Sequence, residues 1–431
     1  MNYQVHTFGC KVNTYDSGLI QKNLNQTPLV LDPKTKIHVL NTCAVTAEAT
    51  KEALRMIRRI KAKEPLATVV VTGCAAQVDT GAFENLPGAD LVVANSHKGL
   101  LPQILDRYFK GEITDKVFKS NIFRKEELEM GGGEEASHTR SFLKIQDGCN
   151  SFCTFCIIPY ARGKSRSIPI RELSRRIQDL QAQGVNEVVL TGVHIGDYED
   201  QGKTLEDLVE ALLATTQMPR FRLSSLEPIE LSDRLVELYQ NPRMCPHFHM
   251  SIQSAESETL KHMKRKYSEA EVRDSLLKIS HQVPGSFVGM DVIAGFPTET
   301  EEQFESTYQT LSELPWTKLH VFPYSERSGT RAAVMGVSVR WEERLKRAQK
   351  LRELSLHRYQ SEALKQKDQI KKALVLKKES RGGARGLSRD FWPVKFSQDI
   401  EGSGFEVEVR IIGYEQDGKT LEGVLLAEVI K

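Results

Sequence analysis

The sequence has no hydrophobic run long enough to cross a bilayer and almost no net charge. A membrane-spanning helix needs about 20 consecutive apolar residues, and the 431-residue chain offers no such run. The N-terminus is polar and lacks the basic segment followed by an apolar one that marks a secretory signal. We therefore expect no membrane partner and a cytoplasmic location. The formal net charge is only +2, so any argument for a nucleic-acid partner must come from local basic clusters.

Cysteine is also scarce, with seven residues in the whole chain. In a reducing compartment, thiols at such spacings bind metal or take part in chemistry more often than they form disulfides. Cys245 follows no pattern and is interpreted as an ordinary thiol. The other six form two sets of three: Cys10, Cys43 and Cys74, and Cys149, Cys153 and Cys156.

Three regions with different patterns follow one another along the chain, which is too long for one ordinary core. Residues 1–125 alternate strand and helix patterns, typical of an open parallel α/β sheet. Residues 126–138 are polar, contain three consecutive glycines and are the best linker candidate. Residues 139–365 continue the alternation, which indicates a partial or complete parallel barrel followed by a long basic helix. Residues 366–431 have short strands and Gly-rich turns, typical of a small all-β barrel.

Cys149, Cys153 and Cys156, here called the loop set, have the spacing C-x₃-C-x₂-C directly after a predicted strand at Phe142–Ile145. Active sites of parallel barrels lie at the C-terminal ends of the strands. Thiolates hold iron–sulfur clusters, and three of them can bind three irons of a 4Fe–4S cluster while the fourth iron stays open. The alternative is a zinc knuckle, but structural zinc normally has four protein ligands, and no fourth cysteine or histidine stands nearby in the sequence.

Cys10, Cys43 and Cys74, here called the strand-end set, each end a strand-like run. The carboxyl ends of parallel strands lie at one edge of a sheet, so we expect these three cysteines to converge in space. The alternative is three independent buried thiols. We interpret the set as the ligands of a second 4Fe–4S cluster, again with one open iron.

The loop set, with the aromatic Phe155 before its last cysteine, resembles the radical S-adenosylmethionine (SAM) superfamily. This resemblance implies that the open iron chelates SAM, which is cleaved by one-electron reduction to a 5′-deoxyadenosyl radical. Both cysteine sets together with the C-terminal barrel resemble the methylthiotransferases over essentially the whole chain. The fold implied is a methylthiotransferase N-terminal domain, a radical SAM barrel and a C-terminal TRAM barrel.

Four motifs are similar to the branch that acts on threonylcarbamoyladenosine beside the tRNA anticodon. They lie at Gly9–Asn13, Asn41–Thr46, Lys144–Asn150 and Ile157–Gly163. The isopentenyladenosine branch would show Met before Asn13, and the ribosomal-protein branch would show Pro-Lys-Asn after the first cysteine. An enzyme of either branch remains an alternative, and so does a multi-cluster electron-transfer or iron-sensing protein.

The resemblance also implies the reaction and its partners. One SAM methylates a sulfur, and a second yields the radical that removes hydrogen from adenine C2. The partners are a tRNA anticodon stem-loop, an external electron donor and a sulfur donor. Ser251 and Gln253 have the alternative role of polar filling inside the barrel. The residues implied to contact SAM are Phe155, Thr191, Gly192, Ser251, Gln253, Ile293 and Gly295.

Basic residues gather at three places that could contact RNA. One follows the loop set, and a second consists of Lys261, Lys264, Arg265 and Lys266. The third lies on the C-terminal barrel beside an aromatic residue, where such barrels bind RNA through basic loops and stacking. A solvated charged face is the alternative. The RNA-contact candidates are Arg162, Arg166, Lys377, Lys378, Arg381, Arg385, Arg389 and Trp392. A separate local pattern, Thr298 followed by Glu301, predicts a capping box that opens a helix.

Overall fold

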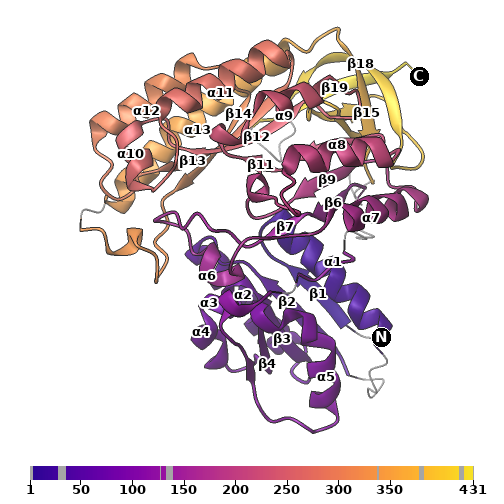
Figure 1. The fold of residues 1–431 in the computed structure, drawn as a ribbon, viewed down its shortest axis with the longest axis vertical. Helices are drawn as coiled ribbons and strands as arrows, with labels where there is room; N and C mark the ends of the chain where they lie inside the picture. The colour runs from indigo at the N-terminus through magenta and orange to yellow at the C-terminus, as the bar shows by residue number, and fades with distance from the viewer. Residues whose placement is uncertain are drawn as a thin grey trace.

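The computed structural model describes residues 3–27, 35–126, 128–132, 139–336, 339–377, 383–416 and 422–430. The N-terminal domain lies at the bottom of Figure 1, the central domain arches above it, and the C-terminal barrel stands at one end of the arch. This mixed α/β architecture with a small closed barrel confirms the expected fold class. None of the described helices is long and apolar enough to cross a membrane.

The N-terminal domain is a parallel sheet whose five strands follow chain order. Its central strands are buried along their whole length and rich in apolar residues, as expected for a sheet covered on both faces. The fifth strand was not expected, because two residues give no periodic signal. The strands are β1 (Tyr3–Thr7), β2 (Ile37–Thr42), β3 (Thr68–Gly73), β4 (Leu91–Ala94) and β5 (Val117–Phe118).

Helices cover both faces of this sheet. On one face α1 (Lys11–Gln26) and α5 (Leu101–Phe109) pack on the apolar strand residues, and on the other face α2 (Ala47–Lys63) does so together with α3 (Cys74–Val78) and α4 (Thr80–Glu84). Helix α1 also contacts the central domain through Tyr15 and Leu19. It is therefore the element shared by the two domains.

The central domain is a partial barrel of parallel strands. Two sheets, with the orders β10-β9-β6 and β11-β12-β13-β14, lie in succession. No pairing among the described strands joins β6 to β14, so the barrel is open on that side. Its strands are β6 (Ser141–Lys144), β9 (Val188–Thr191), β10 (Phe221–Leu223), β11 (Ser225–Leu226), β12 (His247–Gln253), β13 (Phe287–Ala294) and β14 (Lys318–Pro323).

Helices follow the strands on the outer side of the arch (Figure 1). The cysteine loop itself lies between a two-residue antiparallel pair, β7 (Gln146–Asp147) with β8 (Arg166–Ser167), and the short helix α6 (Ile158–Arg162). The long helix α13 packs against β14. The outer helices are α7 (Ile170–Ala182), α8 (Leu205–Thr215), α9 (Asp233–Glu237), α10 (Ser257–His262), α11 (Glu269–Gln282), α12 (Glu301–Glu313) and α13 (Trp341–Leu364).

The capping box expected at Thr298 lies two residues later. The N-cap of α12 is Thr300, whose hydroxyl accepts a hydrogen bond from the Gln303 backbone N–H at 3.2 Å. The Thr300 backbone N–H in turn donates to Gln303 Oε1 at 2.9 Å. Thr298 has a φ of 77° and its hydroxyl lies 2.9 Å from His262 Nδ1. Both Thr298-x-x-Glu301 and Thr300-x-x-Gln303 fit the pattern, and only the path of the chain selects the second.

The C-terminal domain is a closed barrel with the strand order β15-β16-β17-β19-β18. Trp392 is only 3% exposed and packs in its core against Phe287 and Tyr359 of the central domain. The surface position expected for Trp392, as a base-stacking platform, is therefore wrong. The strands are β15 (Ile370–Val375), β16 (Arg385–Ser388), β17 (Pro393–Phe396), β18 (Glu406–Glu415) and β19 (Val424–Val429).

The described glycines of the expected linker are held between the two domains. Gly132 donates its N–H to Tyr15 Oη at 3.1 Å and accepts from Arg176 Nε at 3.0 Å. A Cβ at Gly132 would lie 2.8 Å from the Tyr15 ring, so this close crossing requires glycine. Gly131 accepts a hydrogen bond from Lys22, whereas 127 and 133–138 lie outside the described residues.

Candidate active site between the two cysteine sets

A cavity of about 630 Å³ lies between the N-terminal sheet and the open barrel. Cys10, Cys43 and Cys74 all line it, on the side of the N-terminal domain. Phe155, which stands within the loop set, lines it from the barrel side. The three strand-end cysteines thus share one space, as their matched positions predicted.

Strand register produces this convergence. Thr7 pairs with Asn41 and Thr42 pairs with Gly73, so β1, β2 and β3 end at the same level. Gly9 has a φ of 88°, and a Cβ there would lie 2.6 Å from Cys43 Sγ. Glycine at this position therefore allows the close approach of the first two cysteines.

Burial and neighbouring thiols raise the pKa of two of the strand-end cysteines, Cys10 and Cys43. Burial and the nearby Cys74 raise the pKa of Cys43 to about 12, and burial also raises the pKa of Cys10. Arg162 Nε donates to Cys74 Sγ at 3.2 Å. Crowded, desolvated thiols of this kind bind as thiolates when a metal supplies positive charge. The donor set therefore fits an iron–sulfur cluster.

The loop set is held by backbone contacts rather than by a helix. Gly148 has a φ of 79°, and a Cβ there would lie 1.9 Å from the Lys164 carbonyl oxygen. Cys149 donates its N–H to the Gly163 carbonyl at 3.1 Å. These contacts fix the start of the loop against its return strand, so the loop thiols are presented before any metal binds.

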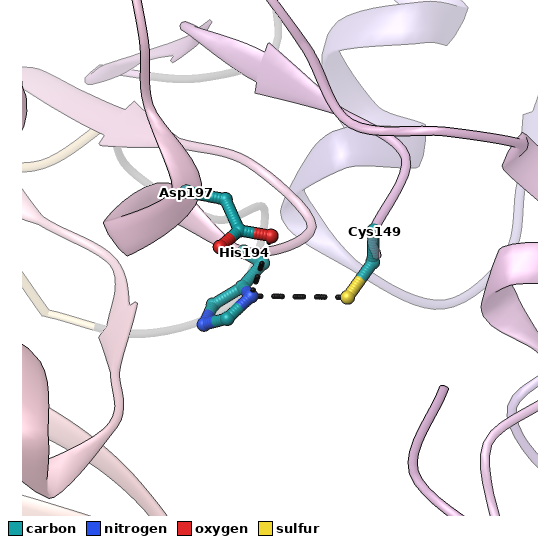
Figure 2. Close-up of side chains that lie close together, drawn as sticks. All are labelled: Cys149, His194 and Asp197. Carbon is teal, nitrogen blue, oxygen red and sulfur yellow. Dashed lines mark hydrogen bonds and ion pairs between the residues drawn. The ribbon is translucent and has the colours of Figure 1, made fainter. Parts of the chain in front are cut away.

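His194 faces the first cysteine of the loop set (Figure 2). Its Nδ1 lies 3.8 Å from Cys149 Sγ and 3.1 Å from an Asp197 oxygen. Burial opposes protonation of His194, yet hydrogen bonds with Asp197 and Cys149 raise its pKa well above the usual range. Burial likewise opposes ionisation of Cys149, but the hydrogen bond from His194 lowers the pKa of this thiol.

These three side chains are close enough together to be considered as metal ligands. One ring nitrogen of His194 faces both Cys149 and Asp197, and the other nitrogen is ion-paired with Glu230. A protonated imidazole donates hydrogen bonds and cannot bind a metal. We therefore interpret His194 as a donor to the Cys149 thiolate. His194 lies 45 residues after Cys149 along the chain, so the spacing of the loop set gives no sign of it.

Arg265 plays a similar role at the second cysteine. It donates to Cys153 Sγ at 3.5 Å and is ion-paired with Glu227. Burial and the nearby Cys153 raise the pKa of Cys156 to about 12. As in the strand-end set, these thiols would ionise most readily when a metal centre supplies positive charge.

Five of the seven residues expected to contact SAM line the cavity: Phe155, Thr191, Gly192, Gln253 and Ile293. Gln253 has a φ of 62° at an irregularity in the pairing of β12, and a strained non-glycine residue of this kind is typical of functional sites. The other two residues, Ser251 and Gly295, are not among the described residues that line the cavity.

The surroundings of those two residues explain their positions. The backbone carbonyl of Ser251 accepts a hydrogen bond from Tyr267 at 2.8 Å. A Cβ at Gly295 would lie 2.5 Å from Arg344 Cγ, so glycine there allows α13 to pack against the end of β13. The contact with SAM expected for Gly295 stays a prediction.

A buried ionic network joins the two domains beside the cavity. Asp16 of α1 binds Lys98 at 2.8 Å, Lys144 at 2.7 Å and Arg162 at 3.1 Å. Arg162 also binds Asp147 at 2.9 Å. Burial opposes the ionisation of Asp16, but the cations hold its pKa well below the usual range. The network is fully charged and couples α1 to the loop set.

Arg162 therefore does not have the surface position expected of an RNA contact. Its side chain is 3% exposed and binds Asp16, Asp147 and Cys74. Arg166 is partly buried and donates to the backbone carbonyls of Lys125 and Arg162 at 3.0 and 2.7 Å. Its role in RNA contact stays a prediction.

The basic residues of the C-terminal barrel have different positions. Arg389 binds Glu406 and the Pro242 carbonyl, so it joins the barrel to the central domain rather than extending into solvent as expected. Lys377 is exposed just after the end of β15, and Arg385 is partly buried at the start of β16. Lys378 and Arg381 lie outside the described residues.

The cavity also contains a cluster of four polar side chains, His249, Asp291, His320 and Lys11. His249 Nε2 lies 2.9 Å from Asp291 Oδ1, and the His320 ring centroid lies 5.4 Å from that of His249. Burial lowers the pKa of His320 to about 4, and burial together with Arg140 lowers the pKa of Lys11 to about 8. All four side chains line the cavity. Only the alternation of strand side chains could have placed the barrel residues, and it does not distinguish a cavity from a packed interior.

Two family models match this chain. The model of the Radical SAM superfamily matches residues 143–311, and the model described as Uncharacterized protein family UPF0004 matches residues 2–94. The first contains the loop set, and the second contains the strand-end set. The boundary between them falls within the region that holds the domain junction.

Among solved structures, the chain is similar in fold to TsrM from Kitasatospora setae, a radical S-adenosylmethionine methyltransferase. The TM-score is 0.53 at 15% identity, with 73% of this chain and 66% of that chain covered. At this identity the likeness concerns the fold alone.

Curated relatives are much more similar to this chain in sequence than the solved structure is. A Rickettsia prowazekii protein named threonylcarbamoyladenosine tRNA methylthiotransferase MtaB is 39% identical, with 78% of each chain covered. The MtaB protein of Aquifex aeolicus is 36% identical over 87% of this chain and 93% of its own. A Desulfotalea psychrophila protein named tRNA-2-methylthio-N(6)-dimethylallyladenosine synthase is 30% identical over 77% of this chain and 78% of its own. The chain is therefore an enzyme of the radical SAM superfamily and belongs to the family of threonylcarbamoyladenosine tRNA methylthiotransferases.

Proposed function

We propose that this enzyme attaches a methylthio group to C2 of N6-threonylcarbamoyladenosine next to the tRNA anticodon, using two 4Fe–4S clusters. The loop set would hold the cluster that binds SAM, and the strand-end set would hold the second cluster. The observation that carries the proposal is the single cavity lined by Cys10, Cys43 and Cys74 on one wall and by Phe155 on the other. A base in this cavity would lie between the two sets.

The chain's own residues support this division. His194 and Arg265 supply positive charge to Cys149 and Cys153, which stabilises thiolates. Arg162 supplies positive charge to Cys74. Each cysteine set thus has its own donors from the surrounding protein, as hydrogen-bonded ligands of a metal centre do.

When bound, the clusters supply the one-electron chemistry that cleaves SAM and the site at which sulfur is methylated. The hydrogen on C2 leaves with the deoxyadenosyl group, and a carbon–sulfur bond takes its place. Two SAM molecules are consumed for each product, one as methyl donor and one as radical source. The sulfur and the electrons come from separate donors in the cytoplasm.

RNA contact is proposed to involve the cavity entrance and the basic residues of the C-terminal barrel. Anticodon loops present unpaired bases that can be turned out into a pocket. Arg166 lies in β8, which follows the loop set along the chain, and Lys377 and Arg385 lie on the C-terminal barrel. Together they would bind the backbone of the stem-loop.

The test is a reaction of anaerobically reconstituted protein with an anticodon stem-loop carrying threonylcarbamoyladenosine. SAM, a reductant and sulfide are supplied, and the digested RNA is analysed by mass spectrometry. A methylthio group on the modified nucleoside is the expected result. Product on isopentenyladenosine RNA alone, or on neither RNA, would contradict the proposed substrate.

A further inference from the structure

Lys11 is a cavity residue whose charge the protein does not neutralise. It is the first residue of α1, directly after Cys10, and its side chain lines the cavity. Among the described residues it makes no ion pair and no side-chain hydrogen bond. The other cationic lining residue, Arg162, is bound by Asp16 and Asp147. A partly buried ammonium without a partner is unfavourable unless a ligand supplies one.

The protein around Lys11 adds further positive charge. Arg140, Asp291 and Arg222 are all close enough to act on the charge of Lys11. The two guanidinium groups oppose this charge, and the Asp291 carboxylate favours it. Both guanidinium groups bind the same buried carboxylate, Glu187, which also binds Arg220. One carboxylate therefore serves three guanidinium groups, although Arg220 has Glu406 as a second partner. The excess charge at this end of the cavity favours an anionic ligand.

Asp291 is the only carboxylate among the described residues that line the cavity. One of its oxygens is bound to His249 at 2.9 Å, which offsets part of its charge. It does not form an ion pair with Lys11. Asp291 and His249 are therefore available to polar groups of a ligand whose anionic end lies at Lys11.

We propose that Lys11 is the specificity residue that binds the carboxylate of the amino-acid group on the modified adenosine. The proposal rests on the function proposed above and assigns it a recognition site. A threonylcarbamoyl group carries one carboxylate and one hydroxyl, whereas a dimethylallyl group carries neither. Lys11 would thus attract the first substituent and be left desolvated and unpaired by the second. Specificity of this kind comes as much from the penalty on the wrong ligand as from the contact with the right one.

The experiment compares the binding of two stem-loops by anaerobically reconstituted enzyme in fluorescence anisotropy. One carries threonylcarbamoyladenosine, and the other carries its carboxamide, which has the same shape without the charge. The quantity compared is the Kd of the carboxamide divided by the Kd of the acid. Within one preparation this ratio does not depend on how much of the protein carries clusters. We expect Lys11→Gln to lower this ratio about tenfold to a hundredfold, and Lys11→Arg to retain most of it. Lys63→Gln, at the exposed C-terminal end of α2, is the matched control and should change nothing.

Two other anions could be bound by Lys11, and the same experiment separates them. Equal weakening of both stem-loops would show a contact with the RNA phosphate backbone and would overturn the proposal. An unchanged ratio with a higher Kd for SAM would show a contact with the SAM carboxylate and would also overturn it. If the wild-type enzyme instead binds the carboxamide as tightly as the acid and methylthiolates neither, the proposed function fails before Lys11 is tested.

Discussion

The two cysteine sets reach the same cavity by different routes. The loop set lies within eight consecutive positions, from Cys149 to Cys156, so its geometry is local. The strand-end set is drawn from positions 10, 43 and 74 and depends on a correctly paired sheet. A local loop can bind metal on any scaffold that holds its ends, whereas a set spread over three strands exists only in the folded domain. The two sets should therefore respond differently to substitution.

The largest effect is expected at the centre of the loop set. Cys153→Ala removes one of three ligands and should abolish reductive cleavage of SAM, because the cluster cannot form. Iron should fall from about eight to about four per chain. Chromatography of 5′-deoxyadenosine and a colorimetric iron assay measure the two quantities. Cleavage at the normal rate would rule out the role of the loop set.

The second prediction separates the sets. Cys43→Ala should also lower iron to about four per chain but should leave SAM cleavage in place while methylthiolated RNA is lost. Cys245→Ala is the matched control, because Cys245 is buried and belongs to neither set; it should retain both activities. A Cys43→Ala enzyme that keeps its iron and its product would show that the strand-end set holds no cluster.

A third substitution addresses the connection between the sets. Arg162→Ala removes the cation shared by Asp16, Asp147 and Cys74 and leaves buried carboxylates undercompensated. Breaking a buried ion pair from one side costs about 3–5 kcal/mol, to be measured by urea denaturation under anaerobic conditions. Arg234→Ala, which breaks exposed pairs with Asp207 and Glu210, is the control and should cost clearly less than Arg162→Ala. Equal costs for the two would show that the network does not hold the domains together.

The smallest effect is expected at His194, which contacts the loop set and not the strand-end set. His194→Gln removes a charged donor to Cys149. Loss of a hydrogen-bonding partner of a metal ligand typically lowers metal affinity or activity about 10- to 100-fold. SAM cleavage by the single variant should fall by that factor. In the double variant with Cys153→Ala, the remaining iron should equal that of Cys153→Ala alone. A lower iron content in the double variant would mean that His194 also acts on the strand-end set.

The sequence was sufficient for the order of domains and for the two cysteine sets. The strand predicted at Phe142–Ile145 lies within one residue of β6 (Ser141–Lys144), because apolar runs between turn residues are local signals. Helix α2 begins after Thr46, whose side chain accepts a hydrogen bond from the Ala49 backbone N–H. Two-residue strands such as β5 were missed because they contain less than one period of any pattern.

Errors were concentrated where a side chain's partner is distant in sequence. Arg162 was expected at the surface because basic residues usually are, but its partner Asp16 lies 146 residues earlier. Trp392 was expected beside solvent, yet it covers the joint between barrel and central domain. His194 had no assigned role because Cys149, which it faces, lies 45 residues earlier in the chain. Lys11 had none because the cavity that it lines is formed by residues of both domains.

The sequence by itself determined which cysteines are candidates to bind iron, since thiol chemistry and strand-end positions are encoded locally. Only the tertiary structure decided which charges are neutralised and which remain available. Arg162 is consumed by a buried network, and Lys11 is left open to the cavity. The physical reason is that electrostatic pairing depends on distance and dielectric environment, and both are set by the packing of segments far apart in the chain.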